Sequence, residues 1–100
     1  MTLLQKHQED IRELCKKYKV KTLYAFGSVL TDQFNDRSDM DLIVDFANVK
    51  LEDYGDNYFD FKFSLEDTLN RKIDLLESQA IKNPYFLNHI NQRRMLIYGQ

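Results

Sequence analysis

The segment Ser38-Asp39-Met40-Asp41-Leu42-Ile43-Val44 decides how this chain folds. Two aspartates alternate with Met40 and lead into an apolar run, a pattern that is typical of a largely buried strand. Side chains two residues apart on a strand point to the same face, so Asp39 and Asp41 should converge on one position. Carboxylates held that close repel each other unless a cation lies between them. We therefore expect a strand over 40–46 that presents a cation-binding carboxylate pair.

Gly27 and Ser28 end a second predicted strand, over 20–26, and precede Asp39 by a spacer of ten residues. An ordinary turn would also use this pair, because Gly accepts positive φ and Ser bonds to nearby backbone. Ahead of a carboxylate strand, however, the pair indicates an anion cradle. Gly lets a phosphate approach the backbone, while the Ser hydroxyl and successive N–H groups donate to it. We predict that Gly27 and Ser28 bind the phosphates of a nucleotide.

A third carboxylate, Asp74, interrupts the apolar run of a further predicted strand, Lys72-Ile73-Asp74-Leu75-Leu76. Mg²⁺ prefers such hard oxygen ligands. Two metal ions roughly 3.5–4 Å apart can clamp the attacking and leaving oxygens of a phosphoryl transfer. We predict that Asp39, Asp41 and Asp74 are the catalytic residues and hold two Mg²⁺ ions, for which Mn²⁺ can substitute. Asp45 shares the face of Asp41 but lies about 13 Å further along the strand, too far to join them.

The order of these motifs resembles that of the minimal nucleotidyltransferases, small relatives of the DNA polymerase β-like nucleotidyltransferase superfamily. The resemblance covers nearly the whole chain, including Arg71-Lys72-Ile73-Asp74-Leu75 and a closing helix from Asn83-Pro84. The chain departs from the family at Val29-Leu30-Thr31-Asp32, where many members have a basic residue and a second Gly. This departure removes one phosphate contact. The resemblance implies an α/β (α+β) nucleotidyltransferase fold, a small mixed β-sheet flanked by helices in one compact domain over 1–100.

Family members are often the antitoxin partners of HEPN-domain toxins. The resemblance therefore implies transfer of AMP from ATP to a tyrosine of a HEPN-domain protein encoded nearby, as in a type VII-like antitoxin. Two alternatives remain open: an antitoxin that neutralises its HEPN partner by binding alone, and an enzyme that modifies a small molecule. Retention of all three carboxylates favours an enzyme, and the absence of room for a substrate domain favours a macromolecular acceptor.

Composition is consistent with one globular domain. The chain has 100 residues, of which 43% are hydrophobic, and its formal net charge is −2. This charge argues against direct nucleic-acid binding, which depends on concentrated Lys and Arg. We find no run long enough to cross a membrane and no signal peptide. Cys15 is the only cysteine, so no internal disulfide can form, and a cytoplasmic location is expected.

Apolar residues at helical spacing predict three helices. The first should begin at Thr2 as N-cap, and the second should carry a stripe from Tyr54 to Leu69 and stop at Asn70 in the left-handed conformation. The last should begin with Asn83 as N-cap and Pro84 at the first helical position, include Met95 and Ile97, and end at Gly99. We expect His7, His89 and Arg37 to be structural or exposed.

Overall fold

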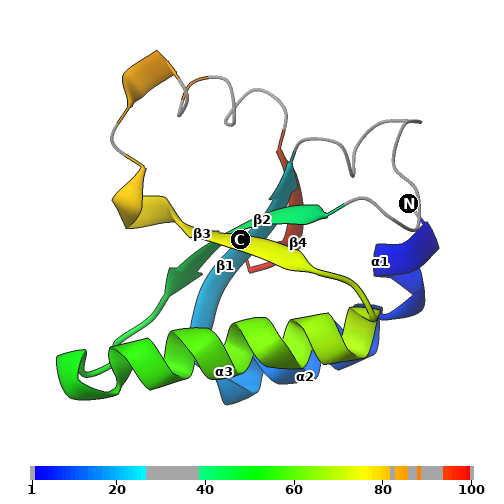
Figure 1. Cartoon of the computed structure of the whole chain (residues 1–100), viewed down its shortest axis with the longest axis horizontal. Helices are drawn as coiled ribbons and strands as arrows, with labels where there is room; N and C mark the ends of the chain where they lie inside the picture. The colour runs from blue at the N-terminus through cyan, green and yellow to red at the C-terminus, as the bar shows by residue number, and fades with distance from the viewer. Residues whose placement is uncertain (1, 27–38, 82, 86–87, 89–93, 100) are drawn as a thin grey trace.

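The computed structural model of this chain describes residues 2–26, 39–81, 83–85, 88 and 94–99. Within these ranges, four strands form one sheet, and helices cover one of its faces (Figure 1). The elements are α1 (Thr2–Lys6), α2 (Gln8–Lys17), β1 (Val20–Phe26), β2 (Met40–Phe46), α3 (Leu51–Leu69), β3 (Ile73–Glu77), a short 3₁₀ helix η2 (Ser78–Ala80) and β4 (Met95–Tyr98). No helix among these residues is long and apolar enough to cross a membrane.

The sheet is mixed, with strand order β3-β2-β1-β4. β1 pairs antiparallel with both β2 and β4, whereas β2 and β3 pair in parallel. Parallel neighbours require a crossover connection, and α3 provides it between β2 and β3. The predicted strands over 20–26 and 40–46 and the mixed sheet flanked by helices are confirmed.

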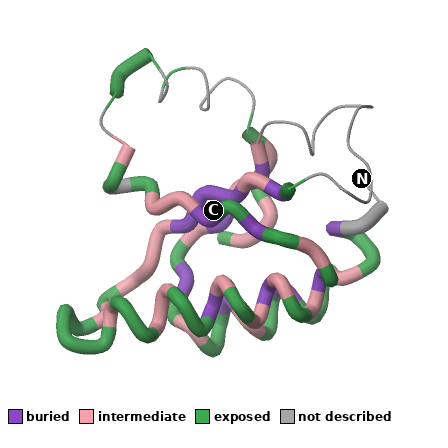
Figure 2. Tube along the Cα trace, viewed as in Figure 1, coloured by how far each residue is buried: buried purple, intermediate pink, exposed green. Residues whose placement is uncertain are grey.

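The core lies between the sheet and the helices α2 and α3. Figure 2 shows the buried residues on the facing sides of these elements. Phe61 of α3 is completely buried, with its ring centroid 5.9 Å from those of Tyr18 and Phe46. Alternate strand residues complete the core on this side: Leu23, Ala25, Leu42, Val44, Ile73 and Leu75. The intervening residues, among them Tyr24, Asp41, Ile43 and Asp74, therefore occupy the opposite face of the sheet.

The predicted closing helix is right at its start and wrong at its end. Pro84 and Tyr85 are helical, and the N–H of Tyr85 donates to Asn83 Oδ1 at 3.0 Å, as expected for an N-cap. Met95–Tyr98, however, is the strand β4, so the helix does not continue to Gly99. A short apolar run is compatible with the periodicity of a helix or of a strand. Here the pairing with β1 makes it a strand. The predicted helix anchors Phe86, Leu87 and Ile90 lie outside the described residues.

The predicted first helix is divided in two. His7 separates α1 from α2 with a non-helical φ of −105° and ψ of 18°, and Thr2 belongs to α1 itself. The apolar stripe of α2 is confirmed, because Ile11 and Cys15 are buried. Asn70 ends α3 in the left-handed conformation with φ 52° and ψ 47°, also as predicted.

Candidate active site

The parallel register of β2 and β3 places Asp41 directly opposite Asp74. Neighbouring strands lie about 4.8 Å apart, so the two residues occupy adjacent positions in one row across the sheet. Met40 and Leu42 beside Asp41, and Ile73 beside Asp74, are buried on the helix side. Both carboxylates therefore point to the face of the sheet opposite the helices. Their adjacency is a property of the fold that no spacing in the sequence determines.

The electrostatics of Asp41 show that negative charge is concentrated at this position. Burial raises the pKa of the Asp41 carboxyl above its ordinary value, and the charges of Asp74 and Asp39 and a hydrogen bond with Asp74 raise it further. Asp39 is exposed and immediately precedes β2. Asp41 thus interacts with both of the other predicted catalytic carboxylates.

Strand β1, which precedes the segment predicted to bind phosphate, ends beside Asp41. Phe26, the last residue of β1, pairs with Asp41. Gly27 and Ser28 follow Phe26 in the chain but lie outside the described residues. Their role in phosphate binding stays a prediction.

The described residues include no group of three Asp, Glu, His or Cys side chains arranged to hold one metal ion. Asp41 and Asp74 form the close pair, with Asp39 beside them. The donor chemistry nevertheless fits a divalent cation, because all three groups are hard carboxylate ligands. A cation would also relieve the repulsion that raises the pKa of Asp41.

Side chains of α3 hold β3, and with it Asp74, in place. The backbone N–H of Ile73 donates to Glu66 Oε2 at 2.9 Å, and the Tyr58 hydroxyl donates to the carbonyl oxygen of Leu75. These bonds lie on either side of Asp74 in the sequence. The apolar stripe predicted that Tyr58 packs on the core; the bond made by its hydroxyl was not predicted, because helical spacing carries no information about it.

A second tyrosine of α3 extends this contact along β3. The Tyr54 hydroxyl donates to Glu77 Oε2 at 2.8 Å. Burial, followed by this bond and the charge of Glu77, raises the pKa of Tyr54 to about 12. Tyr54 therefore stays protonated at neutral pH and acts as a stable donor. Neither tyrosine hydroxyl is a base for catalysis.

In this sheet, two strands that carry aspartates pair in parallel and present their carboxylates on the face opposite the helices, an arrangement consistent with a nucleotidyltransferase. The family model "Polymerase beta, Nucleotidyltransferase" matches residues 9–100, and the chain belongs to this family.

The chain is 37% identical over 90 residues to "Putative protein adenylyltransferase MJ0128" of Methanocaldococcus jannaschii, covering 90% of this chain and 86% of the relative. Solved structures share the fold. One is a "putative minimal nucleotidyltransferase", with a TM-score of 0.76, 23% identity and 95% coverage of both chains. Another comes from a complex of tri-AMPylated Shewanella oneidensis HEPN toxin with MNT antitoxin, with a TM-score of 0.66, 17% identity, and coverage of 97% of this chain and 73% of the other.

Proposed function

We propose that this nucleotidyltransferase transfers AMP from ATP to a tyrosine of a HEPN-domain protein and thereby acts as its antitoxin. The observation that carries the proposal is the opposition of Asp41 and Asp74 across the parallel pair β2 and β3. Two carboxylates on one sheet face, with a third beside them, suit a reaction in which phosphate charge must be neutralised.

In the proposed reaction, the tyrosine oxygen of the acceptor attacks the α-phosphorus of ATP. A new oxygen–phosphorus bond forms, the bond to the β-phosphate oxygen breaks, and pyrophosphate leaves. Asp74 accepts the proton of the acceptor hydroxyl, and Gly27 and Ser28 bind the terminal phosphates of the nucleotide. Asp39 and Asp41 would hold divalent cations beside these phosphates. Bound Mg²⁺ would supply charge neutralisation at the phosphates. The protein residues themselves position the reacting groups.

The choice of a protein acceptor is supported by two kinds of likeness. The 37% identical relative carries the name of a protein adenylyltransferase. The fold is shared with a chain from a complex of tri-AMPylated HEPN toxin with MNT antitoxin. Transfer of AMP to a HEPN-domain protein is the activity that joins these two.

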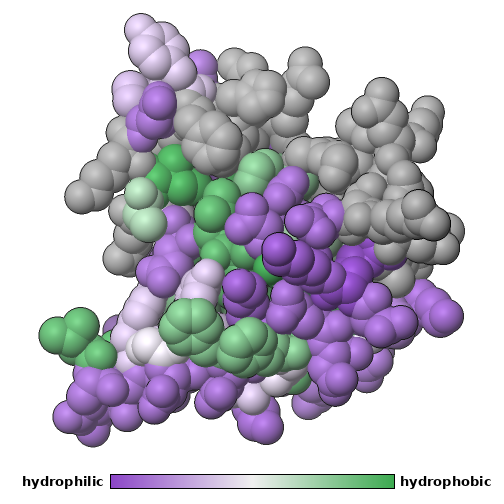
Figure 3. Space-filling view, viewed as in Figure 1, coloured by the Kyte–Doolittle hydropathy of each residue, from purple (hydrophilic) through white to green (hydrophobic). Residues whose placement is uncertain are grey.

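A surface for a protein partner is available on α3. Phe59 and Phe63 are 50% and 56% exposed, and their rings stack with centroids 6.0 Å apart. Figure 3 shows hydrophobic side chains exposed among the polar ones on the side of the molecule where α3 lies. The helix carries six acidic residues and a single lysine, Lys62. This charge disfavours contact with nucleic acid or with α3 of a second copy, and it favours a basic protein surface. The same surface supports the second candidate function, an antitoxin that acts by binding alone.

One experiment separates these two functions. The protein is incubated with Mg²⁺, ATP labelled at the α-phosphate, and the HEPN-domain protein encoded by the neighbouring gene. We expect label on the HEPN protein with the wild type and none with the double variant Asp41→Asn/Asp74→Asn. Label from γ-labelled ATP, or no label at all, would contradict AMP transfer. If the double variant neutralises the toxin as well as the wild type, binding alone is the function.

A further inference from the structure

Arg94 places a positive charge on the face of the sheet that carries the carboxylates. Its guanidinium carbon lies 4.0 Å above the ring centroid of Tyr24. Tyr24 belongs to β1 and pairs with Ile43 of β2, two pairs along from Phe26 and Asp41. Tyr24 is thus on the same face as Asp41. Sequence reasoning missed Arg94 because it assigned this part of the chain to a helix.

The register aligns Arg94 with the acidic pair in one row. Asp74 opposes Asp41, and Asp41 opposes Phe26. Ala25 opposes Met95 in the antiparallel pair of β1 and β4, so Arg94, one residue before Met95, comes level with Phe26. Strands are about 4.8 Å apart, which puts the backbones of Asp41 and Arg94 about 10 Å apart. A long Arg side chain and a phosphate chain together can span this separation.

We infer that Arg94 binds the β- and γ-phosphates of the nucleotide and then the pyrophosphate that leaves, with Tyr24 holding its guanidinium in position. This inference rests on the proposed function and assigns to it a phosphate contact that lies outside Gly27 and Ser28.

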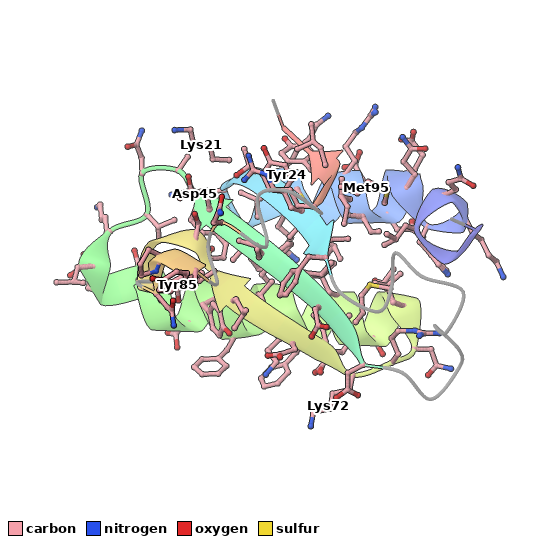
Figure 4. The ribbon with its side chains drawn as sticks, turned by 90° about the horizontal axis from the view of Figure 1, so that it is seen from above. Lys21, Tyr24, Asp45, Lys72, Tyr85 and Met95 are labelled. Carbon is pink, nitrogen blue, oxygen red and sulfur yellow. The ribbon has the colours of Figure 1, made fainter. Side chains whose placement is uncertain are left out.

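The chemistry of the pair suits this role. A guanidinium stacked on an aromatic ring keeps its in-plane N–H groups available, and these groups match phosphate oxygens in pairs. The stack also fixes the side chain before the ligand arrives, which lowers the entropic cost of binding. Lys72 precedes Asp74 by two residues, but Figure 4 shows it at the opposite margin of the sheet from Tyr24. In the row across the sheet, Asp74 lies at one end and Arg94 at the other.

The test measures binding of Mg²⁺–ATP and of Mg²⁺–pyrophosphate by titration calorimetry, separately from transfer activity. Arg94→Ala should weaken both ligands roughly 10- to 100-fold, the range for losing hydrogen bonds to a charged group. Arg94→Lys should recover part of the loss, because it keeps the charge but not the paired donors. Arg12→Ala is the matched control, since Arg12 is an exposed arginine on α2 whose removal changes the net charge equally.

Variants of Tyr24 test the positioning role. Tyr24→Phe keeps the ring and should bind Mg²⁺–ATP like the wild type, whereas Tyr24→Leu removes the stack and should bind about 5-fold more weakly. A melting curve in chelator shows whether each variant is folded. Unchanged melting of Arg94→Ala together with weaker pyrophosphate binding is the expected combination.

The opposing outcomes are distinct. Equal affinity of Arg94→Ala and wild type for Mg²⁺–ATP would overturn this inference while leaving transfer by the wild type, and hence the proposed function, intact. An equal loss in Arg12→Ala would show a general charge effect and would also overturn it. Failure of the wild type to bind Mg²⁺–ATP at all would overturn both the inference and the proposed function.

Discussion

Replacing Asp41 with asparagine should stabilise the metal-free protein. Asp41 is partly buried, and Asp74 and Asp39 add negative charge beside it, so its carboxylate is less favourable in the folded than in the unfolded chain. Asparagine keeps the size and removes the charge. Its amide can also donate to the Asp74 carboxylate across the register. A residue whose removal stabilises the fold is retained for another reason, and we assign that reason to metal and nucleotide binding.

The size of the effect follows from the spacing of the strands. Unit charges about 4 Å apart interact by about 1 kcal/mol in water and about 4 kcal/mol near a protein surface. Because Asp74 is exposed, the lower value of about 1 kcal/mol applies. For a chain of 100 residues this corresponds to a rise in melting temperature of about 4–8 °C.

The effect should also depend on pH. The pKa of Asp41 in the folded state is raised above the ordinary value of 3.8, so the folded protein binds this proton more tightly than the unfolded chain does. The destabilisation is therefore complete above the raised pKa, declines as the pH falls through it, and is absent below 3.8. The difference in melting temperature between Asp41→Asn and wild type should shrink over the same interval.

Thermal melts in chelator at neutral and acidic pH check this prediction. Asp45→Asn is the matched control, because Asp45 lies further along the same face of β2 and is not among the charges that raise the pKa of Asp41. We expect little change in the control. A melting temperature of Asp41→Asn at or below that of the wild type at neutral pH would refute the reasoning and make the carboxylate a structural group.

Further predictions concern the ligands, the chemistry and the fold. Mg²⁺ or Mn²⁺ should raise the melting temperature and ATP should raise it further, by up to about 2.7 kcal/mol of stability at 100 times its dissociation constant; strong ATP binding in chelator would contradict this order. Asp74→Asn should lower transfer at least ~100-fold and ATP affinity only a few-fold, and near-wild-type transfer would remove Asp74 from the site. Gly99→Ala should cost about 1–3 kcal/mol, as measured by denaturant unfolding, because Gly99 has φ +98° and an added Cβ would overlap the Lys21 carbonyl oxygen. Phe61→Ala should cost about 3–5 kcal/mol in the same assay, since Phe61 is completely buried; a loss under 1 kcal/mol would argue against the packing of α3 on the sheet.

The sequence predicted those parts of the fold that depend on local pattern. The alternation of Asp39 and Asp41 with apolar residues identified β2, and the helical stripe that ends at Asn70 identified α3. These signals are local, because periodicity and a left-handed stop act over a few residues.

Features that depend on pairing between strands far apart in the chain could not be derived from the sequence pattern. Met95–Tyr98 forms a strand because it pairs with the free edge of β1. The residues of this run alone do not distinguish a strand from the end of a helix. The sequence predicted that Asp74 joins Asp41 in one site, but their direct opposition follows only from the parallel register of β2 and β3. The position of Arg94 above Tyr24 depends on β4 and was missed with it.

We propose that the row of residues containing Asp41 and Asp74 binds the catalytic metal. Amide resonances followed by NMR during titration with Mn²⁺ test it directly, because this paramagnetic ion broadens signals near its binding site. We predict that the amides of Asp41 and Asp74 broaden at the lowest Mn²⁺ concentrations, and that Asp41→Asn abolishes this effect. Broadening that begins instead along the acidic helix α3, or that persists unchanged in Asp41→Asn, would contradict the account.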